Sequence, residues 1–237
     1  MKFYFFTRVA LKSSEVSAKI RGPLNDDEIG RYCEMWIKES SKFYEHQTVD
    51  REFRVVLRYS AFYQHVVDSF SWPDYSELTR LRPNEWLEQN ATAGPTCLSR
   101  VDADDSYSFD FMELMEQAGT EGMFLHKRIR QLNTRTGQLT KPMRHKSPMF
   151  GSLRFPHFDP AKTDWAITHR KPAWLKGVLG DHGKFHTETH CELHLPVALM
   201  RITGWNQSNR MGLMGRTWNV IEYEDKLDPR FFVCPSQ

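Results

Sequence analysis

The sequence predicts an α/β domain in which a mixed, mostly parallel sheet is flanked by helices. Strand-forming runs occupy residues 2–6, 53–59 and 96–101, and segments with helical spacing separate them. A cluster of aspartates follows the third run directly. Strands that alternate with amphipathic helices are typical of a parallel sheet, because each crossover needs a helix to return the chain.

The first run, residues 2–6, is almost entirely aromatic and ends at Thr7 and Arg8. Aromatic residues favour strands, and an unbroken apolar run favours a strand that is buried on both faces. We therefore expect a central strand whose carboxyl end presents a hydroxyl and a guanidinium. Open α/β sheets bind their ligands at this edge.

A helix is predicted after the polar loop of residues 12–23. Asn25 and Glu28 have the spacing of a capping box, which satisfies backbone N–H groups at a helix start. Apolar side chains then recur at helical spacing and predict the face that packs on the sheet: Ile29, Tyr32, Cys33, Trp36 and Ile37.

The second strand is expected over residues 53–59, and residues 61–70 read as a helix. Its apolar side is predicted to carry Phe62, His65, Val66 and Phe70. Residues 75–89 fit neither pattern clearly. The third strand, residues 96–101, would deliver the aspartates to the same sheet edge as Thr7 and Arg8.

The second half of the chain has a weaker pattern. Residues 109–117 predict a helix, and Gly137 suits a hairpin turn because glycine accepts positive φ. Residues 141–160, rich in Pro and Gly, are expected to be irregular and to form a lid or binding loop. Further strands are expected at residues 123–129 and 163–169 and at the start of residues 199–210.

Asp102, Asp104 and Asp105 place three carboxylates within four residues. Such groups repel one another unless a cation lies between them, and hard oxygen ligands suit Mg²⁺, Mn²⁺ or Ca²⁺. A simpler alternative is that Asp105 or Ser106 caps the next helix. An EF-hand loop is a further alternative, although Tyr107 stands where that loop needs glycine.

Composition excludes several classes of protein. The 237 residues suit one domain, 40% of them are hydrophobic, and the net charge of +2 does not indicate a nucleic-acid-binding surface. The four cysteines form no C-x-x-C pair, so no zinc knuckle or redox motif is indicated. With no leader and no apolar run long enough to span a bilayer, we expect a soluble, cytoplasmic protein with reduced thiols and no integral membrane segment.

Four landmarks in order resemble the GT-A-fold (Rossmann-like) glycosyltransferases of the rhamnosyltransferase type. Together they span nearly the whole chain: Phe5-Phe6-Thr7-Arg8, Phe53-Arg54-Val55-Val56-Leu57, Ser99-Arg100-Val101-Asp102-Ala103-Asp104-Asp105 and Gly204-Trp205-Asn206-Gln207-Ser208-Asn209.

The resemblance implies that the aspartates, chiefly Asp102 and Asp104 with Asp105 beside them, hold Mn²⁺ or Mg²⁺ against the diphosphate of a nucleoside diphosphate sugar. Such a metal would neutralise charge on the departing diphosphate. Asp102 is alternatively a ribose contact. The other substrate contacts that the resemblance and the strand ends suggest are Thr7, Arg8, Arg100 and Asn206.

The chain departs from the family pattern at Thr203, where relatives carry a histidine before Gly-x-Asn. Another residue must then supply the third metal ligand, or metal dependence is weaker. We take His182 as the candidate from a series that recurs every four residues: His182, His186, His190 and His194. A separate zinc site in this series is less favoured because H-E-x-x-H is absent.

An inverting transfer needs a general base to deprotonate the acceptor hydroxyl. The candidates after the acidic cluster are Asp164, Asp181 and Glu188, of which Asp164 adjoins Trp165, an aromatic side chain suited to stacking on a sugar ring. The sequence does not rank them firmly, and the first two are carried forward as catalytic residues.

The overall expectation is a single domain, residues 1–237, with a nucleotide-binding half at 1–118, an acceptor-binding half at 119–215 and a tail at 216–237. It would move a hexosyl or deoxyhexosyl group from a nucleoside diphosphate sugar to a glycan hydroxyl. The alternatives are a metal-dependent phosphoesterase or nuclease, in which the carboxylates activate water, and a non-enzymatic Ca²⁺-binding module.

Overall fold

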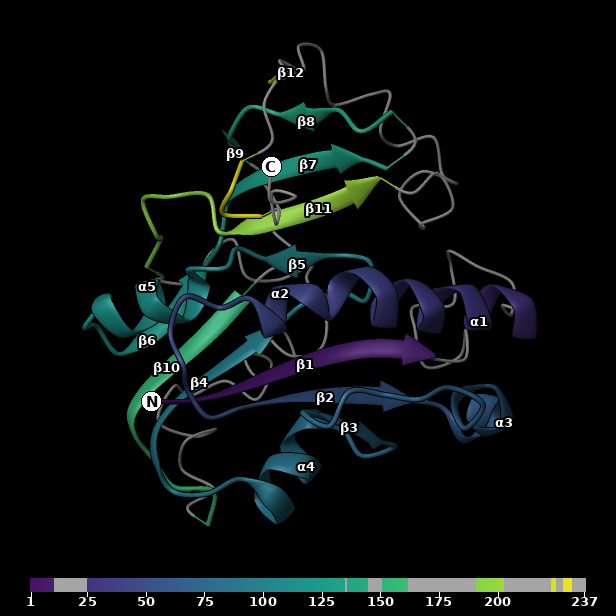
Figure 1. Ribbon diagram of the computed structural model, residues 1–237. Coiled ribbons are helices and arrows are strands. Elements are labelled where there is room, and N and C mark those ends of the chain that lie inside the picture. The colour runs from purple at the N-terminus through teal and green to yellow at the C-terminus, as the bar shows by residue number, and fades with distance from the viewer. Residues whose placement is uncertain are drawn as a thin grey trace.

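The computed structural model describes residues 1–10, 25–134, 136–144, 151–161, 191–202, 223–224 and 228–231. These form two sheets with helices around them (Figure 1). The first sheet has the strand order β3-β2-β1-β4-β10-β6. Its strands are β1 (Lys2–Ala10), β2 (Phe53–Tyr59), β3 (Ser76–Thr79), β4 (Gly94–Arg100), β6 (Gly122–Leu125) and β10 (Gly151–Phe158).

Strands β3, β2, β1 and β4 run parallel to one another, and β10 runs antiparallel to both β4 and β6. The predicted mixed, mostly parallel sheet is therefore confirmed. β1 lies in its interior, where Phe5 pairs with Val55 on one side and with Ser99 on the other. The parallel strands end along a common edge, and the acidic cluster follows β4 there.

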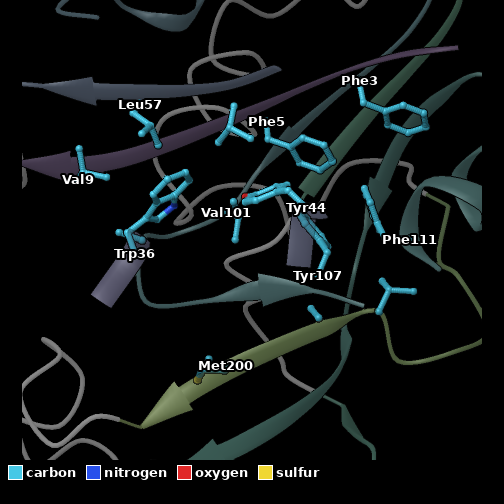
Figure 2. Close-up of a cluster of buried hydrophobic side chains, with 14 of the residues drawn as sticks. Phe3, Phe5, Val9, Trp36, Tyr44, Leu57, Val101, Tyr107, Phe111 and Met200 are labelled. Carbon is cyan, nitrogen blue, oxygen red and sulfur yellow. The ribbon is translucent and has the colours of Figure 1, made fainter. Parts of the chain in front are cut away.

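The predicted capping box is present: Asn25 Oδ1 accepts the backbone N–H of Glu28, and the Glu28 carboxylate accepts that of Asn25. Helix α1 (Asp26–Met35) starts there and continues through the π-helical turn η2 (Trp36–Ser40) into α2 (Lys42–Glu45). Its buried face packs on β1, as predicted. Figure 2 shows Tyr44 of this segment beside Phe5, with 4.9 Å between the two ring centroids, and the Trp36 ring centroid lies 6.2 Å from that of Tyr44.

The opposite face of the first sheet is covered by α4 (Pro83–Asn90). Trp86 of this helix lies edge-on to the rings of Tyr4 and Phe6 of β1. Because successive side chains of a strand point to opposite faces, β1 presents Phe3 and Phe5 to one core and Tyr4 and Phe6 to the other. The region that the sequence left ambiguous, residues 75–89, thus contains β3 and most of α4.

The second sheet has the order β12-β8-β7-β11-β5, and β9 pairs with β7. Side chains of β5, β7 and β11 belong to the same buried cluster as Phe3 and Phe5, so the second sheet packs over the α1 side of the first (Figures 1 and 2). Its strands are β5 (Ser106–Tyr107), β7 (Arg128–Asn133), β8 (Leu139–Thr140), β9 (Met143–Arg144), β11 (Ala198–Ile202) and β12 (Tyr223–Glu224).

Three predictions about the second half are confirmed. α5 (Phe111–Gln117) lies where a helix was expected, and Gly137, with φ of 71°, lies in the turn between the antiparallel strands β7 and β8. The strand expected from residue 199 is β11, whereas the strand expected at residues 163–169 lies outside the described residues.

Three predictions are wrong in part. Residues 141–160 are not one irregular loop, because they contain β9 and the buried strand β10. Residues 123–129 form two strands, β6 and β7, that belong to different sheets. Residues 61–70 contain only the short turns η3 (Ala61–Tyr63) and α3 (Gln64–Val67), which bury Tyr63 and Val67 while Phe62 and His65 are exposed.

No helix in the described parts of the chain is long and apolar enough to cross a membrane. Cys33 and Cys97 are buried thiols, and Cys191 is partly buried. Among the described residues these three cysteines form no disulfide.

Candidate functional site

The candidate site lies where β1 and β4 end side by side. Beyond the last residue of β4, the Val101 N–H still donates to the Phe6 carbonyl at 3.2 Å, so the chain stays against β1. Asp102 follows, and its Oδ1 lies 3.5 Å from Nη2 of Arg8. The prediction that the acidic cluster and Arg8 share one sheet edge is confirmed.

Arg100, the last residue of β4, approaches the same oxygen, with 3.0 Å between Nη2 and Asp102 Oδ1. The two guanidiniums differ in accessibility: the Arg100 side chain is 3% exposed and the Arg8 side chain 28%. The closer pair, whose guanidinium is buried, is suited to fixing the carboxylate in place. The longer, more exposed pair leaves Arg8 able to turn toward a ligand.

Asp104 and Asp105 follow Asp102 but differ in surroundings. Asp104 is partly exposed, whereas Asp105 is buried. Asp105 Oδ1 accepts the backbone N–H of Arg201 at 3.0 Å, and its Oδ2 has no hydrogen-bond partner among the described residues. Burial, reinforced by the charges of Asp104 and Asp102, raises the pKa of Asp105 well above its usual value. The structure thus brings Asp102 and Asp104 to the edge and turns Asp105 toward β11.

Thr7 is a buried residue of β1, on the strand face that also presents Phe5 and Val9 to the core. The other predicted residues lie outside the described residues: Asn206, Asp164, Asp181, His182, His186, His190 and Glu188. His194 is described and exposed, and its carbonyl accepts a hydrogen bond from Arg128 at 2.7 Å.

The two structural alternatives for the acidic cluster do not fit. α5 begins at Phe111 after Asp110, so neither Asp105 nor Ser106 caps it, and Ser106 and Tyr107 form the strand β5. An EF-hand loop needs an entering helix, and here the strand β4 precedes the aspartates.

The side chains at this edge suit a metal that is shared with a phosphate ligand. Within the described residues, no group of three or more His, Cys, Asp or Glu side chains could hold a metal ion. Mg²⁺, however, is usually bound through one or two carboxylates together with substrate phosphates and water, and Mn²⁺ prefers similar oxygen ligands. Asp102 and Asp104 fit that mode, in which the phosphates complete the coordination.

Two guanidiniums and two carboxylates of the described residues lie at this edge. The guanidiniums of Arg8 and Arg100 offset the carboxylates of Asp102 and Asp104. An anionic diphosphate would add negative charge here, and a divalent cation would offset it. The described charges at this edge therefore include groups that could contact a cation and groups that could contact an anion.

Sequence reasoning missed two side chains that hold the acidic cluster. Ser40 of η2 donates to the Ala103 carbonyl at 2.8 Å, and Arg201 of β11 donates to Ser40 Oγ at 3.0 Å. One signal was present, because Arg201 is a charged residue inside an otherwise apolar strand, and such residues are rarely buried without a partner.

No protein-family model matches the chain, and no curated protein matches it. Among solved structures, a Bacillus anthracis protein described as a glucose-1-phosphate thymidylyltransferase, in complex with sucrose, is 11% identical. It covers 92% of this chain and 97% of its own at a TM-score of 0.34. HddC from Yersinia pseudotuberculosis, complexed with GMP-PN, is 8% identical over 84% of this chain and 89% of its own, at a TM-score of 0.33. Likeness at this level assigns neither family nor activity, so function has to be inferred from the chain's own residues.

Proposed function

We propose that this chain is a transferase that uses a nucleoside diphosphate sugar, and specifically a glycosyltransferase that moves a hexosyl or deoxyhexosyl group to a glycan hydroxyl. One observation carries the proposal. At the carboxyl edge of a parallel sheet, Asp102 lies 3.0 Å from Arg100 and 3.5 Å from Arg8, with Asp104 two residues further on. This places carboxylates for a cation beside guanidiniums for phosphate, where α/β sheets bind nucleotides.

Asp102 and Asp104 would hold Mn²⁺ or Mg²⁺ together with the diphosphate. The metal supplies Lewis-acid stabilisation of the leaving diphosphate when it is bound. Arg100 keeps the Asp102 carboxylate oriented, because its buried guanidinium lies 3.0 Å from Asp102 Oδ1 and charge-assisted contacts of this kind are strong. Arg8 binds a phosphate oxygen of the donor by turning away from Asp102, which costs little because the pair is long and partly exposed.

The acceptor side of the reaction rests on sequence. Asp164 or Asp181 would remove the proton from the acceptor hydroxyl, Asn206 would contact substrate, and His182 would complete the metal site. Residues 119–215 would bind the glycan. These assignments remain predictions that await mutagenesis.

The first test measures the binding of nucleoside diphosphates by thermal shift and by calorimetry. We expect uridine, thymidine or guanosine diphosphate to raise the melting temperature with Mn²⁺ or Mg²⁺ present, and Asp102→Asn to abolish the shift. Asp50→Asn is the matched control, because Asp50 is an exposed carboxylate before β2, at the opposite end of the sheet. A shift that Asp102→Asn leaves intact would refute the proposed site.

The second test separates glycosyl transfer from its alternatives by product. With a nucleoside diphosphate sugar and glycan acceptors, we expect release of nucleoside diphosphate and a lengthened glycan. If the protein instead forms pyrophosphate from a nucleoside triphosphate and a sugar phosphate, its activity is nucleotidyl transfer and not glycosyl transfer. Hydrolysis of a generic phosphodiester would favour a phosphoesterase, and stabilisation by Ca²⁺ alone would favour a calcium-binding module.

A further inference from the structure

We propose that Arg201, on β11 of the second sheet, is a positioning residue that holds the acidic loop (residues 102–105) in the geometry needed to bind the metal and the diphosphate. This inference rests on the proposed function of that loop. It assigns to the second sheet a direct influence on the donor site, which is otherwise built from strands of the first sheet.

The backbone of Arg201 makes the first contact. Its N–H donates to Asp105 Oδ1 at 3.0 Å across 96 positions of sequence. Both side chains are buried, and Asp105 Oδ2 has no hydrogen-bond partner among the described residues. A carboxyl group is costly to bury without hydrogen bonds, so the Arg201 N–H stabilises the buried position of Asp105 at the end of the loop.

The guanidinium of Arg201 makes two further connections. Nη1 donates to Ser40 Oγ at 3.0 Å, and Ser40 Oγ in turn donates to the Ala103 carbonyl at 2.8 Å. Nη2 reaches Ser106 Oγ at 3.3 Å. One arginine is therefore connected to the acidic loop and its exit at three points, Ala103, Asp105 and Ser106, which lie around Asp104.

Ser40 reaches the loop from the end of a π-helical turn. In η2 the Ser41 N–H donates to the Trp36 carbonyl at 2.8 Å, five residues back, and this wider turn shifts the register of the helix at Ser40. Turns of this kind occur often at functional sites. Ser40, the last residue of this turn, forms the link from Arg201 to Ala103.

Burial of Arg201 has a cost that its neighbours offset. Its side chain is 3% exposed, and this burial lowers the pKa of the guanidinium. The negative charges of Glu39 and Asp105 act in the opposite direction and raise this pKa. Glu39 Oε2 lies 3.5 Å from Nη1, and the Phe43 ring centroid lies 5.3 Å from the guanidinium carbon. An apolar side chain in β11 would avoid this cost, so the contacts with the loop account best for an arginine here.

Residues that orient metal ligands typically change metal affinity by about 10- to 100-fold when they are mutated. We therefore expect Arg201→Met to weaken the affinity for a nucleoside diphosphate with Mn²⁺ by about tenfold. Arg130→Met is the matched control. Arg130 is also a buried arginine of the second sheet, and its contacts include the Thr140 carbonyl and Asp228. The control should lose melting temperature and keep its affinity.

Calorimetric affinity and melting temperature are measured for the wild type and each variant. Ser40→Ala breaks the link to Ala103 without removing a buried charge, and it should also weaken the affinity for nucleoside diphosphate. This variant tests the inference if Arg201→Met does not fold. Unchanged affinity in folded Arg201→Met or in Ser40→Ala, or an equal loss in Arg130→Met, would overturn the positioning role. A wild type that binds no nucleotide with metal would overturn the proposed function itself.

Discussion

Acid should destabilise the protein through one buried histidine. His126 is 2% exposed, its Nε2 lies 2.8 Å from Ser152 Oγ, and burial lowers its pKa from 6.5 to about 3. Between these values the unfolded chain binds a proton that the folded chain excludes, so stability falls as pH falls. Two pH units below the ordinary pKa, this one group should remove roughly 3 kcal/mol of folding free energy.

His126→Gln removes the titration and keeps an amide that can reach Ser152. Urea unfolding is measured for both proteins near neutral pH and about two units below the ordinary histidine pKa. For each protein we compare the free energy of unfolding at the two pH values and take the difference. The substitution also changes the packing, but that effect is present at both pH values and cancels in the difference. We expect the wild type to lose roughly 3 kcal/mol more than His126→Gln over this interval. Equal losses in the two proteins would refute a buried, neutral His126.

Three further substitutions test the packing, the hairpin and the site. Phe5→Ala removes a fully buried ring from the core between the two sheets, so it should lower the free energy of unfolding by about 3–5 kcal/mol. Urea unfolding measures this loss, and a loss below about 1 kcal/mol would contradict the packing. Gly137→Ala places a side chain at φ of 71° and should lower stability by about 1 kcal/mol, so a stabilised variant would argue against the turn. Arg8→Met should change the melting temperature little, because the Arg8–Asp102 ion pair is long and partly exposed. The same variant should bind nucleoside diphosphate more weakly. Unchanged affinity would show that Arg8 is not part of the site.

The elements best predicted from sequence are those with a strong local pattern. The aromatic run of β1, the capping box of α1 and the apolar run of β2 each identify their element within a few residues. The proximity of Arg8 and Asp102 also followed from sequence, because the carboxyl ends of adjacent parallel strands meet at one edge.

β10 was missed because Pro156 and flanking glycine and proline indicate a loop. Proline donates no backbone hydrogen bond, yet β10 tolerates it where the pairing with β4 shifts register between Phe155 and Phe158. The exposure of Phe62 was missed for another reason. Residues 61–63 form a 3-10 turn, so the helical spacing assumed for residues 61–70 assigned the wrong buried face.

Arg201 shows what a local pattern cannot provide. Its contacts with Asp105, Ser106 and Ser40 span 95 to 161 positions of sequence, so only the folded chain brings them together. For the same reason, sequence placed Asp105 with the metal ligands, whereas the structure turns its carboxylate toward the β11 backbone.

The central claim is that Asp102 and Asp104 bind a cation together with a diphosphate, with Arg8 beside them. The most direct measurement is a calorimetric titration of Mn²⁺ into the protein with and without saturating nucleoside diphosphate, corrected for Mn²⁺ binding to the nucleotide in solution. We predict that each ligand tightens the binding of the other by about tenfold or more, and linkage requires the two factors to be equal. Asp102→Asn should remove this coupling. Mn²⁺ affinity that is the same with and without nucleotide would contradict the account.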